Sequence, residues 1–172
     1  MPKALIIIAQ KGYQDIEEAE TRKALEAAGQ SIVHASSSKG ACIGKLGGTM
    51  EATVTLKDVR VANYDRIAFI GGPGAAVFAE DPEVLRIARE AVAADLPLGA
   101  ICIAPTILAA AGVLRGKRAT VWDDGQETQI RFLEGHGALY SGERVTVDGL
   151  IVTGNGPAAA EEFGKALAGM RT

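Results

Sequence analysis

The stretch Leu98-Gly-Ala-Ile-Cys-Ile-Ala-Pro-Thr-Ile-Leu108 decides how the rest of the chain is interpreted. An apolar run typical of a buried strand ends at Cys102, and a helical spacing of apolar residues begins directly after it. A residue at such a strand-to-helix turn lies at the carboxyl edge of a sheet with its side chain exposed. We therefore expect Cys102 to lie near unpaired backbone N–H groups at the rim of a cleft.

The position of Cys102 has two interpretations. The N–H groups and the dipole of the following helix favour negative charge, which predicts a thiol that ionises readily and acts as a nucleophile. Alternatively, Cys102 is a small apolar residue that fills the core, because free cysteine is among the most buried residue types. The turn alone leaves both interpretations open.

The composition is that of an ordinary soluble globular protein. The 172 residues fit one domain over residues 1–172, with 48% hydrophobic and 23% charged residues. The net charge of −3 gives no electrostatic reason to expect nucleic acid or an acidic membrane as a partner. No apolar run reaches the ~20 residues of a membrane span, and the run Ala4–Ala9 lacks a signal-peptide cleavage site. We expect a cytoplasmic protein.

Short apolar runs alternate with amphipathic stretches, which predicts a three-layer α/β sandwich with a mostly parallel sheet. The glycine-rich segment Ser36–Leu56 differs and predicts a small antiparallel excursion at one edge of the sheet. The expected strands are Ala4–Ala9, Ile32–Ala35, Asp65–Ile70, Leu98–Cys102 and Ala119–Trp122, with a hairpin of Arg144–Val147 and Leu150–Thr153. The expected helices are Asp15–Ala28, Asp81–Ala94, one that follows Cys102 and ends at Gly112, Glu127–Leu133 and Ala158–Ala168.

Ligands of an open α/β sheet bind beyond the carboxyl ends of its strands. Among the residues there, Glu17 could face Cys102, but Glu18 and Glu20 are equally acidic and each could instead lie on a solvated helix face. Gly71 and the glycine after it could present N–H groups to an oxyanion, or they could simply form a tight turn. The loops that this rule selects are Gln10–Glu17, Gly71–Ala75, Cys102–Ala104, Trp122–Gly125 and Gly154–Pro157.

The sequence predicts no cofactor and no metal. The stretch Gly154-Asn-Gly-Pro-Ala-Ala159 fits a dinucleotide fingerprint, but Thr172 ends the chain before the strand and acid that such a site needs. This loop could still bind an anion. The two histidines, His34 and His136, lack ligand spacing to a cysteine or carboxylate. A cysteine–histidine pair would require His136 to fold back towards Cys102.

Five motifs in their order along the chain resemble the ThiJ/PfpI superfamily of flavodoxin-like, glutamine-amidotransferase-like proteins. The resemblance covers essentially the whole chain. The motifs are Tyr13-Gln-Asp-Ile-Glu17, Phe69-Ile-Gly-Gly-Pro-Gly74, Ala100-Ile-Cys-Ile-Ala-Pro105, Ala111-Gly-Val-Leu-Arg-Gly-Lys117, and Asp148-Gly149 with Gly156-Pro157.

The resemblance implies specific roles. Cys102 matches the elbow cysteine, Glu17 the protonated acid that donates a hydrogen bond to the thiolate, and the backbones of Gly72 and Ile103 the oxyanion donors. Members are usually homodimers. Glyoxalase III, deglycase, peptidase and chaperone activities are ascribed to them, together with oxidation sensing.

The chain also departs from the pattern of the superfamily. Many enzymatic members carry histidine directly after the cysteine, where this chain has Ile103. Others carry it at the end of the next strand, where this chain has Trp122 followed by Asp123. Proton transfer would therefore depend on Glu17, Asp123 or water, although Asp123 could instead be an acid of a surface turn. Peptidase activity is disfavoured, because no relay that could protonate a leaving amine is visible.

Three hypotheses about function follow. The first is a stress-response enzyme in which Cys102 attacks a small reactive carbonyl, as in glyoxalase III or a deglycase, with Glu17 and Asp123 as further catalytic candidates. Gly71, Gly72, Ile103 and Trp122 would bind the substrate or its oxyanion. The second is a redox sensor or chaperone-like protein in which Cys102 is oxidised reversibly without turnover. The third is a vestigial site on a protein whose role is assembly.

Overall fold

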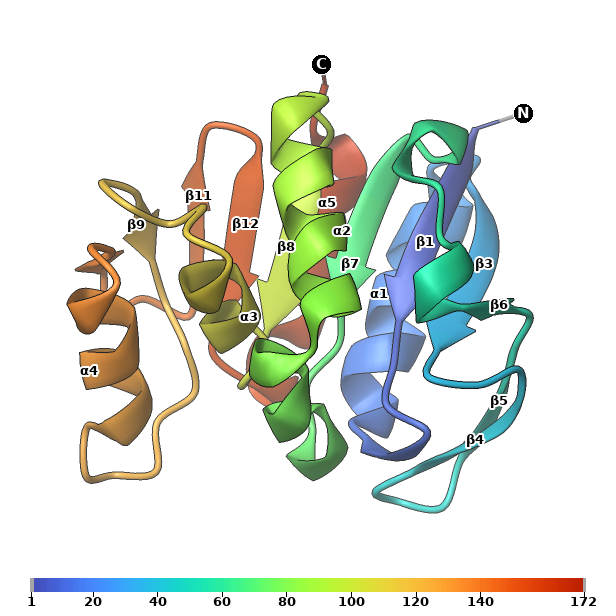
Figure 1. Ribbon diagram of the computed structural model, residues 1–172, viewed down its shortest axis with the longest axis horizontal. Coiled ribbons are helices and arrows are strands. Elements are labelled where there is room, and N and C mark those ends of the chain that lie inside the picture. The colour runs from blue at the N-terminus through green and yellow to red at the C-terminus, as the bar shows by residue number, and fades with distance from the viewer. Residues whose placement is uncertain (1, 172) are drawn as a thin grey trace.

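A seven-stranded sheet forms the middle layer of the computed structural model, which describes residues 2–171 (Figure 1). Its strands are β1 (Lys3–Ile7), β3 (Ser31–Ser36), β6 (Val54–Thr55), β7 (Arg66–Phe69), β8 (Leu98–Ile101), β11 (Val145–Asp148) and β12 (Ile151–Gly154). They lie in the order β11-β12-β8-β7-β1-β3-β6, and every neighbouring pair is parallel except β11 with β12. The predicted flavodoxin-like α/β fold is confirmed.

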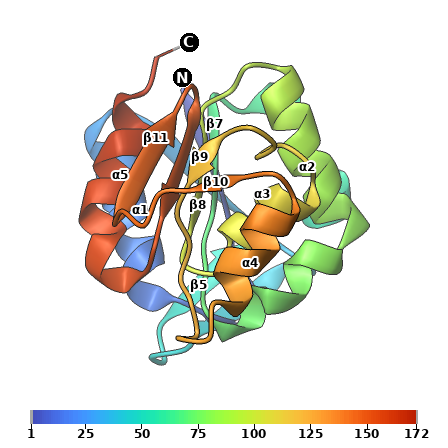
Figure 2. The same cartoon turned by 90° about the vertical axis from the view of Figure 1, so that its left-hand side faces the viewer.

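Helices cover both faces of this sheet. In Figure 2, α1 and α5 lie on one side, and α2 and α3 lie on the other with α4 beside them. The bounds are α1 (Asp15–Ala27), α2 (Pro82–Ala93), α3 (Pro105–Ala110), α4 (Thr128–Gly135) and α5 (Ala160–Gly169). Short 3-10 turns lie at Leu56–Asp58, Val61–Asn63, Pro73–Glu80 and Pro157–Ala159.

Local sequence explains how these layers pack. The apolar run 4–8 gives the central strand β1, and its side chains are fully buried. Helix α2 begins where the Asp81 carboxylate accepts hydrogen bonds from the N–H groups of Glu83 and Val84, at 2.9 and 3.4 Å. Gly99 lets α5 approach β8, because a Cβ atom there would lie 2.7 Å from the ring of Phe163.

A second, three-stranded sheet flanks the first loop of the chain. It contains β2 (Lys11–Tyr13), β4 (Gly40–Gly44) and β5 (Thr49–Ala52), and β4 and β5 form the predicted antiparallel excursion. Strand β2 was not expected, because the sequence predicts only a loop there. Its parallel pairing with β4 joins the first loop to the hairpin, so both reach the carboxyl edge of the main sheet.

Two predicted elements need correction. The expected strand Ala119–Trp122 does not join the main sheet, since only β9 (Arg118–Ala119) pairs, with β10 (Leu139–Tyr140), in a separate two-stranded sheet. Beyond β9, the Thr120 N–H donates to the side-chain Oγ1 of Thr153 on β12 at 2.9 Å, and not to a backbone carbonyl of that strand. The helix after Cys102 is also shorter than predicted, because it begins at Pro105 and ends before Gly112.

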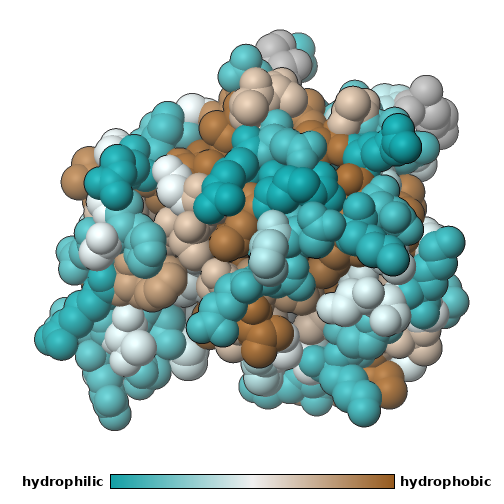
Figure 3. Space-filling model, viewed as in Figure 1, coloured by the Kyte–Doolittle hydropathy of each residue, from teal (hydrophilic) through white to brown (hydrophobic). Residues whose placement is uncertain are grey.

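The outer surface mixes both kinds of side chain. On the face shown in Figure 3, hydrophilic side chains cover the outward side of α2, and hydrophobic ones form small patches between them. No helix within residues 2–171 combines the length and the apolar character that crossing a bilayer requires.

Candidate active site

Cys102 occupies a strained turn directly after β8. Its φ angle of 65° lies in the left-handed region, which costs a non-glycine residue about 1–2 kcal/mol. Two backbone hydrogen bonds hold the turn, because the Cys102 N–H donates to Gly154 O and the Cys102 carbonyl accepts from the Trp122 N–H, each at 2.9 Å. The side chain is half-buried. The neighbouring strand end and the Trp122 loop thus fix the direction of the thiol.

The first turn of α1 buries Glu17 beside Cys102. Gln14 caps the helix, since its Oε1 accepts from the N–H groups of Ile16 and Glu17 at 2.7 and 3.0 Å. The Gln14 N–H donates to Gly71 O at 2.9 Å, which ties the helix start to the loop after β7. Glu17 has no exposed surface, and its Oε1 accepts from the Gly71 N–H at 3.0 Å.

Two glycines make this close approach possible. A Cβ atom on Gly71 would lie 2.5 Å from Cys102 Cβ and 2.9 Å from Glu17 Oε1, so any side chain would separate the thiol from the acid. Gly72 has a φ angle of 104°, and its Cα faces the backbone of Gly12 and Gln14. The Gly71 N–H is occupied by Glu17, so among the predicted oxyanion donors only Gly72 and Ile103 remain.

Burial governs the acidities of the two groups. Desolvation raises the pKa of Glu17 from its ordinary value of 4.5 to about 7, although the hydrogen bond from Gly71 and the interaction with the Cys102 side chain oppose this. Glu17 Oε2 has no hydrogen-bond partner of regular geometry among residues 2–171, which fits an oxygen that carries a proton.

The thiol behaves differently from the sequence prediction of a readily ionised cysteine. Burial first, and then the charge of Glu17, raise the pKa of Cys102 to about 12, while the N–H groups of Gly72 and Ile103 lower it. Helix α3 has only six residues and begins at Pro105, so its dipole contributes little at the sulfur. The resting site therefore holds a protonated thiol beside an acid that titrates near neutrality.

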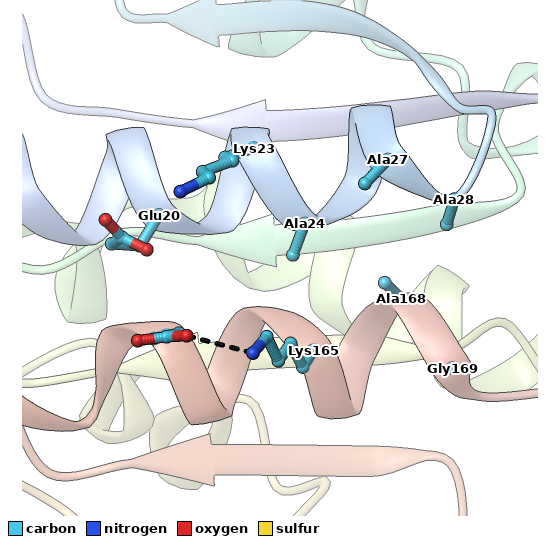
Figure 4. Close-up of a pocket in the computed structure, with 9 residues that line it drawn as sticks. Glu20, Lys23, Ala24, Ala27, Ala28, Lys165, Ala168 and Gly169 are labelled. Carbon is cyan, nitrogen blue, oxygen red and sulfur yellow. Dashed lines mark hydrogen bonds and ion pairs between the residues drawn. The ribbon is translucent and has the colours of Figure 1, made fainter.

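The other two acids of α1 lie elsewhere. Glu18 pairs with His34 Nε2 at 2.8 Å and with Arg22 Nε at 2.9 Å, and this pairing lowers its pKa although burial opposes the shift. Glu20 lines a hollow of about 430 Å³ between α1 and α5, on the side of the sheet shown in Figure 4. That hollow is bordered by alanines and by the Glu161–Lys165 ion pair, and no nucleophile lines it. Glu17 is thus the acid that reaches Cys102.

The sulfur opens into a pocket of about 490 Å³ at the carboxyl edge of the sheet. The loops of the sequence prediction meet here, and Trp122, whose side chain is 40% exposed, forms part of the wall. Sequence reasoning missed Lys45, which comes from the turn between β4 and β5 and carries no motif. The lining residues are Gln14, Lys45, Gly72, Pro73, Ala76, Cys102, Ile103, Trp122 and Pro157.

Asp123 is placed away from this pocket. Its Oδ2 accepts from the N–H groups of Gly125 and Glu127 at 2.8 and 2.9 Å, and its Oδ1 from Ile130 N–H at 3.4 Å. These hydrogen bonds organise the loop before α4. The structure therefore gives Asp123 a structural role, because the carboxylate is committed to backbone groups and is absent from the pocket wall.

Neither histidine lies at the site. His34 is held by Glu18, and His136 Nδ1 lies 2.8 Å from the carbonyl oxygen of Phe132 at the end of α4. Within residues 2–171, no three His, Cys, Asp or Glu side chains are grouped so that they could hold a metal ion. Glu17 is therefore the titratable side chain that the described residues place beside Cys102.

Comparisons with known proteins identify the family and the fold of the chain. The model of the DJ-1/PfpI family matches residues 2–170. A glutathione-independent glyoxalase of Caenorhabditis elegans is 31% identical over 93% of this chain and 83% of its own, and a deglycase of Pyrococcus horikoshii is 28% identical over 91% of each. The crystal structure of a ThiJ/PfpI domain protein from Brachyspira murdochii superposes with a TM-score of 0.91 at 27% identity, covering 97% of this chain and 94% of that one. The chain belongs to the DJ-1/PfpI family.

Proposed function

We propose that this protein is a Cys102-dependent enzyme that converts small 2-oxoaldehydes into 2-hydroxy acids, with Glu17 as the proton carrier. The observation that carries the proposal is the buried Glu17 carboxyl beside the thiol, with a pKa raised to about 7. A group that titrates near the working pH can both accept and return a proton. The glyoxalase and deglycase names of the relatives support the same class of reaction.

The reaction begins with attack of the thiol on the aldehyde carbon. Glu17, as carboxylate, accepts the thiol proton while the C–S bond forms, and it then gives this proton to the aldehyde oxygen. The product is a hemithioacetal. The N–H groups of Gly72 and Ile103, which face the sulfur, also support the negative charge that develops during this step.

An internal rearrangement then produces the acid. Glu17 removes the hydrogen on the former aldehyde carbon as a proton, and the neighbouring carbonyl oxygen is protonated to give an enediol. A proton returns to the second carbon, the hydroxyl on the first carbon loses its own, and a thioester of the 2-hydroxy acid results. Water hydrolyses the thioester and restores the thiol. The net reaction adds one water to the 2-oxoaldehyde and needs no external oxidant.

Turnover of methylglyoxal to lactate by the pure protein tests this proposal. We expect lactate formation that disappears in the Cys102→Ser variant and falls at least about 100-fold in Glu17→Gln, because the amide cannot carry the proton. Cys42 supplies the matched control, since it is fully buried elsewhere and Cys42→Ser should leave turnover unchanged. Lactate at the level of the Cys102→Ser variant would reject the proposed enzyme.

A second candidate is a redox sensor, and the absence of both histidines from the pocket favours it. Without imidazole, Cys102 could react with peroxide and not turn over carbonyls: the thiol and peroxide give sulfenic acid and water, and a second peroxide gives sulfinic acid. Mass spectrometry after mild peroxide should then show oxygen on Cys102 and none on Cys42. Equal oxidation of both cysteines would count against this candidate.

The family resemblance also supports a cytoplasmic homodimer that acts without a cofactor. Light scattering on the purified protein tests the assembly, and a mass near twice that of the 172-residue chain is the expected result. A monomer at micromolar concentration would contradict it.

A further inference from the structure

We propose that the Cys102 pocket selects 2-oxoaldehydes that carry a carboxylate at their far end, and that Lys45 binds this carboxylate. The inference rests on the proposed function, because it places the substrate carbonyl at Cys102. The first observation behind the inference is that the side chains that line the pocket include a cation and no anion. Nine residues line the pocket, and they include one lysine and no aspartate or glutamate.

The position of Lys45 is fixed through its backbone. Its N–H donates to Tyr13 O at 2.8 Å, and the Asp15 carboxylate accepts from the N–H groups of Leu46 and Gly48 at 2.8 and 2.7 Å. These bonds fasten the turn between β4 and β5 to the start of α1, close to Glu17. The turn that carries Lys45 at the pocket is therefore held in place by backbone and side-chain hydrogen bonds.

The ammonium group of Lys45 has no partner in the part of the chain that the structure describes. It forms no ion pair within residues 2–171. Asp15, at the start of α1, accepts two backbone N–H groups of the turn that carries Lys45. The charge of Lys45 acts on the site, because it lowers the pKa of Glu17 against the larger effect of burial. An anionic ligand would supply the partner that this lysine lacks.

Gln14 adds a second donor to the same wall. Its Oε1 accepts from two N–H groups of α1, which fixes the orientation of the side-chain amide. The Nε2 group then faces away from these bonds and forms no hydrogen bond with the described residues. Gln14 is only 7% exposed and lines the pocket, so Nε2 is available to an acceptor on the ligand.

The size of the pocket suits a ligand longer than methylglyoxal. A volume of about 490 Å³ falls within the range of small-molecule sites, and the remaining wall includes the apolar residues Pro73, Ala76 and Pro157. The acid 4,5-dioxopentanoate has the required 2-oxoaldehyde, two methylene groups and a terminal carboxylate. Its neutral counterpart, 2-oxopentanal, has the same carbon chain with a methyl group in place of the carboxylate.

Alkylation of Cys102 measures the selectivity without any turnover. Iodoacetate and iodoacetamide have nearly the same shape, but only the first is anionic. The quantity to measure is the rate of Cys102 alkylation by iodoacetate divided by the rate by iodoacetamide. At low salt we expect this ratio to be about 5-fold higher in the folded protein than in the urea-unfolded chain. This preference should weaken in 1 M salt, be lost in Lys45→Met and survive in Lys45→Arg. Lys39→Met, at an exposed position outside the pocket, is the matched control and should retain it.

Turnover of the matched aldehydes separates the two proposals. A KM for 4,5-dioxopentanoate that is at least about 5-fold below that for 2-oxopentanal, with the difference lost in Lys45→Met, supports the inference. An alkylation preference without turnover supports anion selectivity and rejects the enzyme. A normalised alkylation ratio near one, or one that Lys45→Met leaves unchanged, overturns the inference whether or not methylglyoxal is consumed.

Discussion

Replacing Glu17 by glutamine should stabilise the protein at high pH. The carboxyl is fully buried, and its pKa rises from 4.5 in an unfolded chain to about 7 in the fold. Each tenfold change in a proton affinity corresponds to about 1.4 kcal/mol, so burial of the ionised acid costs about 3 kcal/mol above pH 7. Glutamine keeps the acceptor for the Gly71 N–H and carries no charge, so the variant avoids this cost.

The sign of the effect follows from where the proton resides. Below pH 4.5 Glu17 is protonated in both states, and the substitution should change stability little. Between pH 4.5 and about 7 the folded chain keeps a proton that the unfolded chain has lost, so the wild-type free energy of unfolding falls as pH rises. The advantage of Glu17→Gln should therefore grow by about 2.5 kcal/mol between pH 5 and pH 8.

Urea unfolding at several pH values, in reducing buffer and at one protein concentration, measures this difference. Glu26→Gln on the same helix is the control, because its side chain is 54% exposed and remains hydrated in both states. Its effect should vary little with pH. A Glu17→Gln variant whose stability relative to wild type is the same at pH 5 and pH 8 would refute the reasoning, because the acid would then ionise in the fold as easily as in water.

Three further substitutions test the supporting residues. Gly71→Ala should lower methylglyoxal turnover by about 100-fold and the free energy of unfolding by about 1–3 kcal/mol, because the new Cβ would lie 2.5 Å from Cys102 Cβ. Full activity of this variant would contradict the close packing. Asp15→Ala should speed amide hydrogen exchange in the turn that carries Lys45, and unchanged exchange would show that the turn is held by other contacts. Asp123→Ala should cost about 1 kcal/mol in urea unfolding with turnover kept within twofold, whereas a 100-fold loss of turnover would make Asp123 catalytic.

The turn at Cys102 could be predicted because local signals agree there. Four apolar residues precede the cysteine, and Pro105 favours a helix start three residues after it. The glycines after β7 could likewise be placed at the same sheet edge, since parallel strands end together there. The predicted strand Ala119–Trp122 was wrong because the Thr120 N–H donates to the side chain of Thr153 and not to a backbone carbonyl, a contact that no local pattern reveals.

The choice among the acids of α1 depends on tertiary contacts. Glu17 and Glu18 are adjacent in sequence, and both are buried. One is placed at the thiol by the loop of Gly71, and the other is paired with His34 on β3. Lys45 was missed for a related reason, because the sequence shows that a hairpin exists but not where its turn is fastened. Asp15 fastens it through a contact across more than thirty residues of chain.

Two unfavourable features of the fold lie side by side at the candidate site. Cys102 adopts a left-handed backbone, and Glu17 is buried at a cost of about 3 kcal/mol when ionised. Neither feature stabilises the chain, and a fold under no other constraint would avoid both. They do place a buried proton carrier beside a thiol that opens into the pocket. Burial makes the acid harder to ionise, and for the same reason its ionised form destabilises the fold. The stability lost between pH 4.5 and about 7 and the ability of Glu17 to hold a catalytic proton are therefore two measurements of one interaction, and Glu17→Gln should abolish both together.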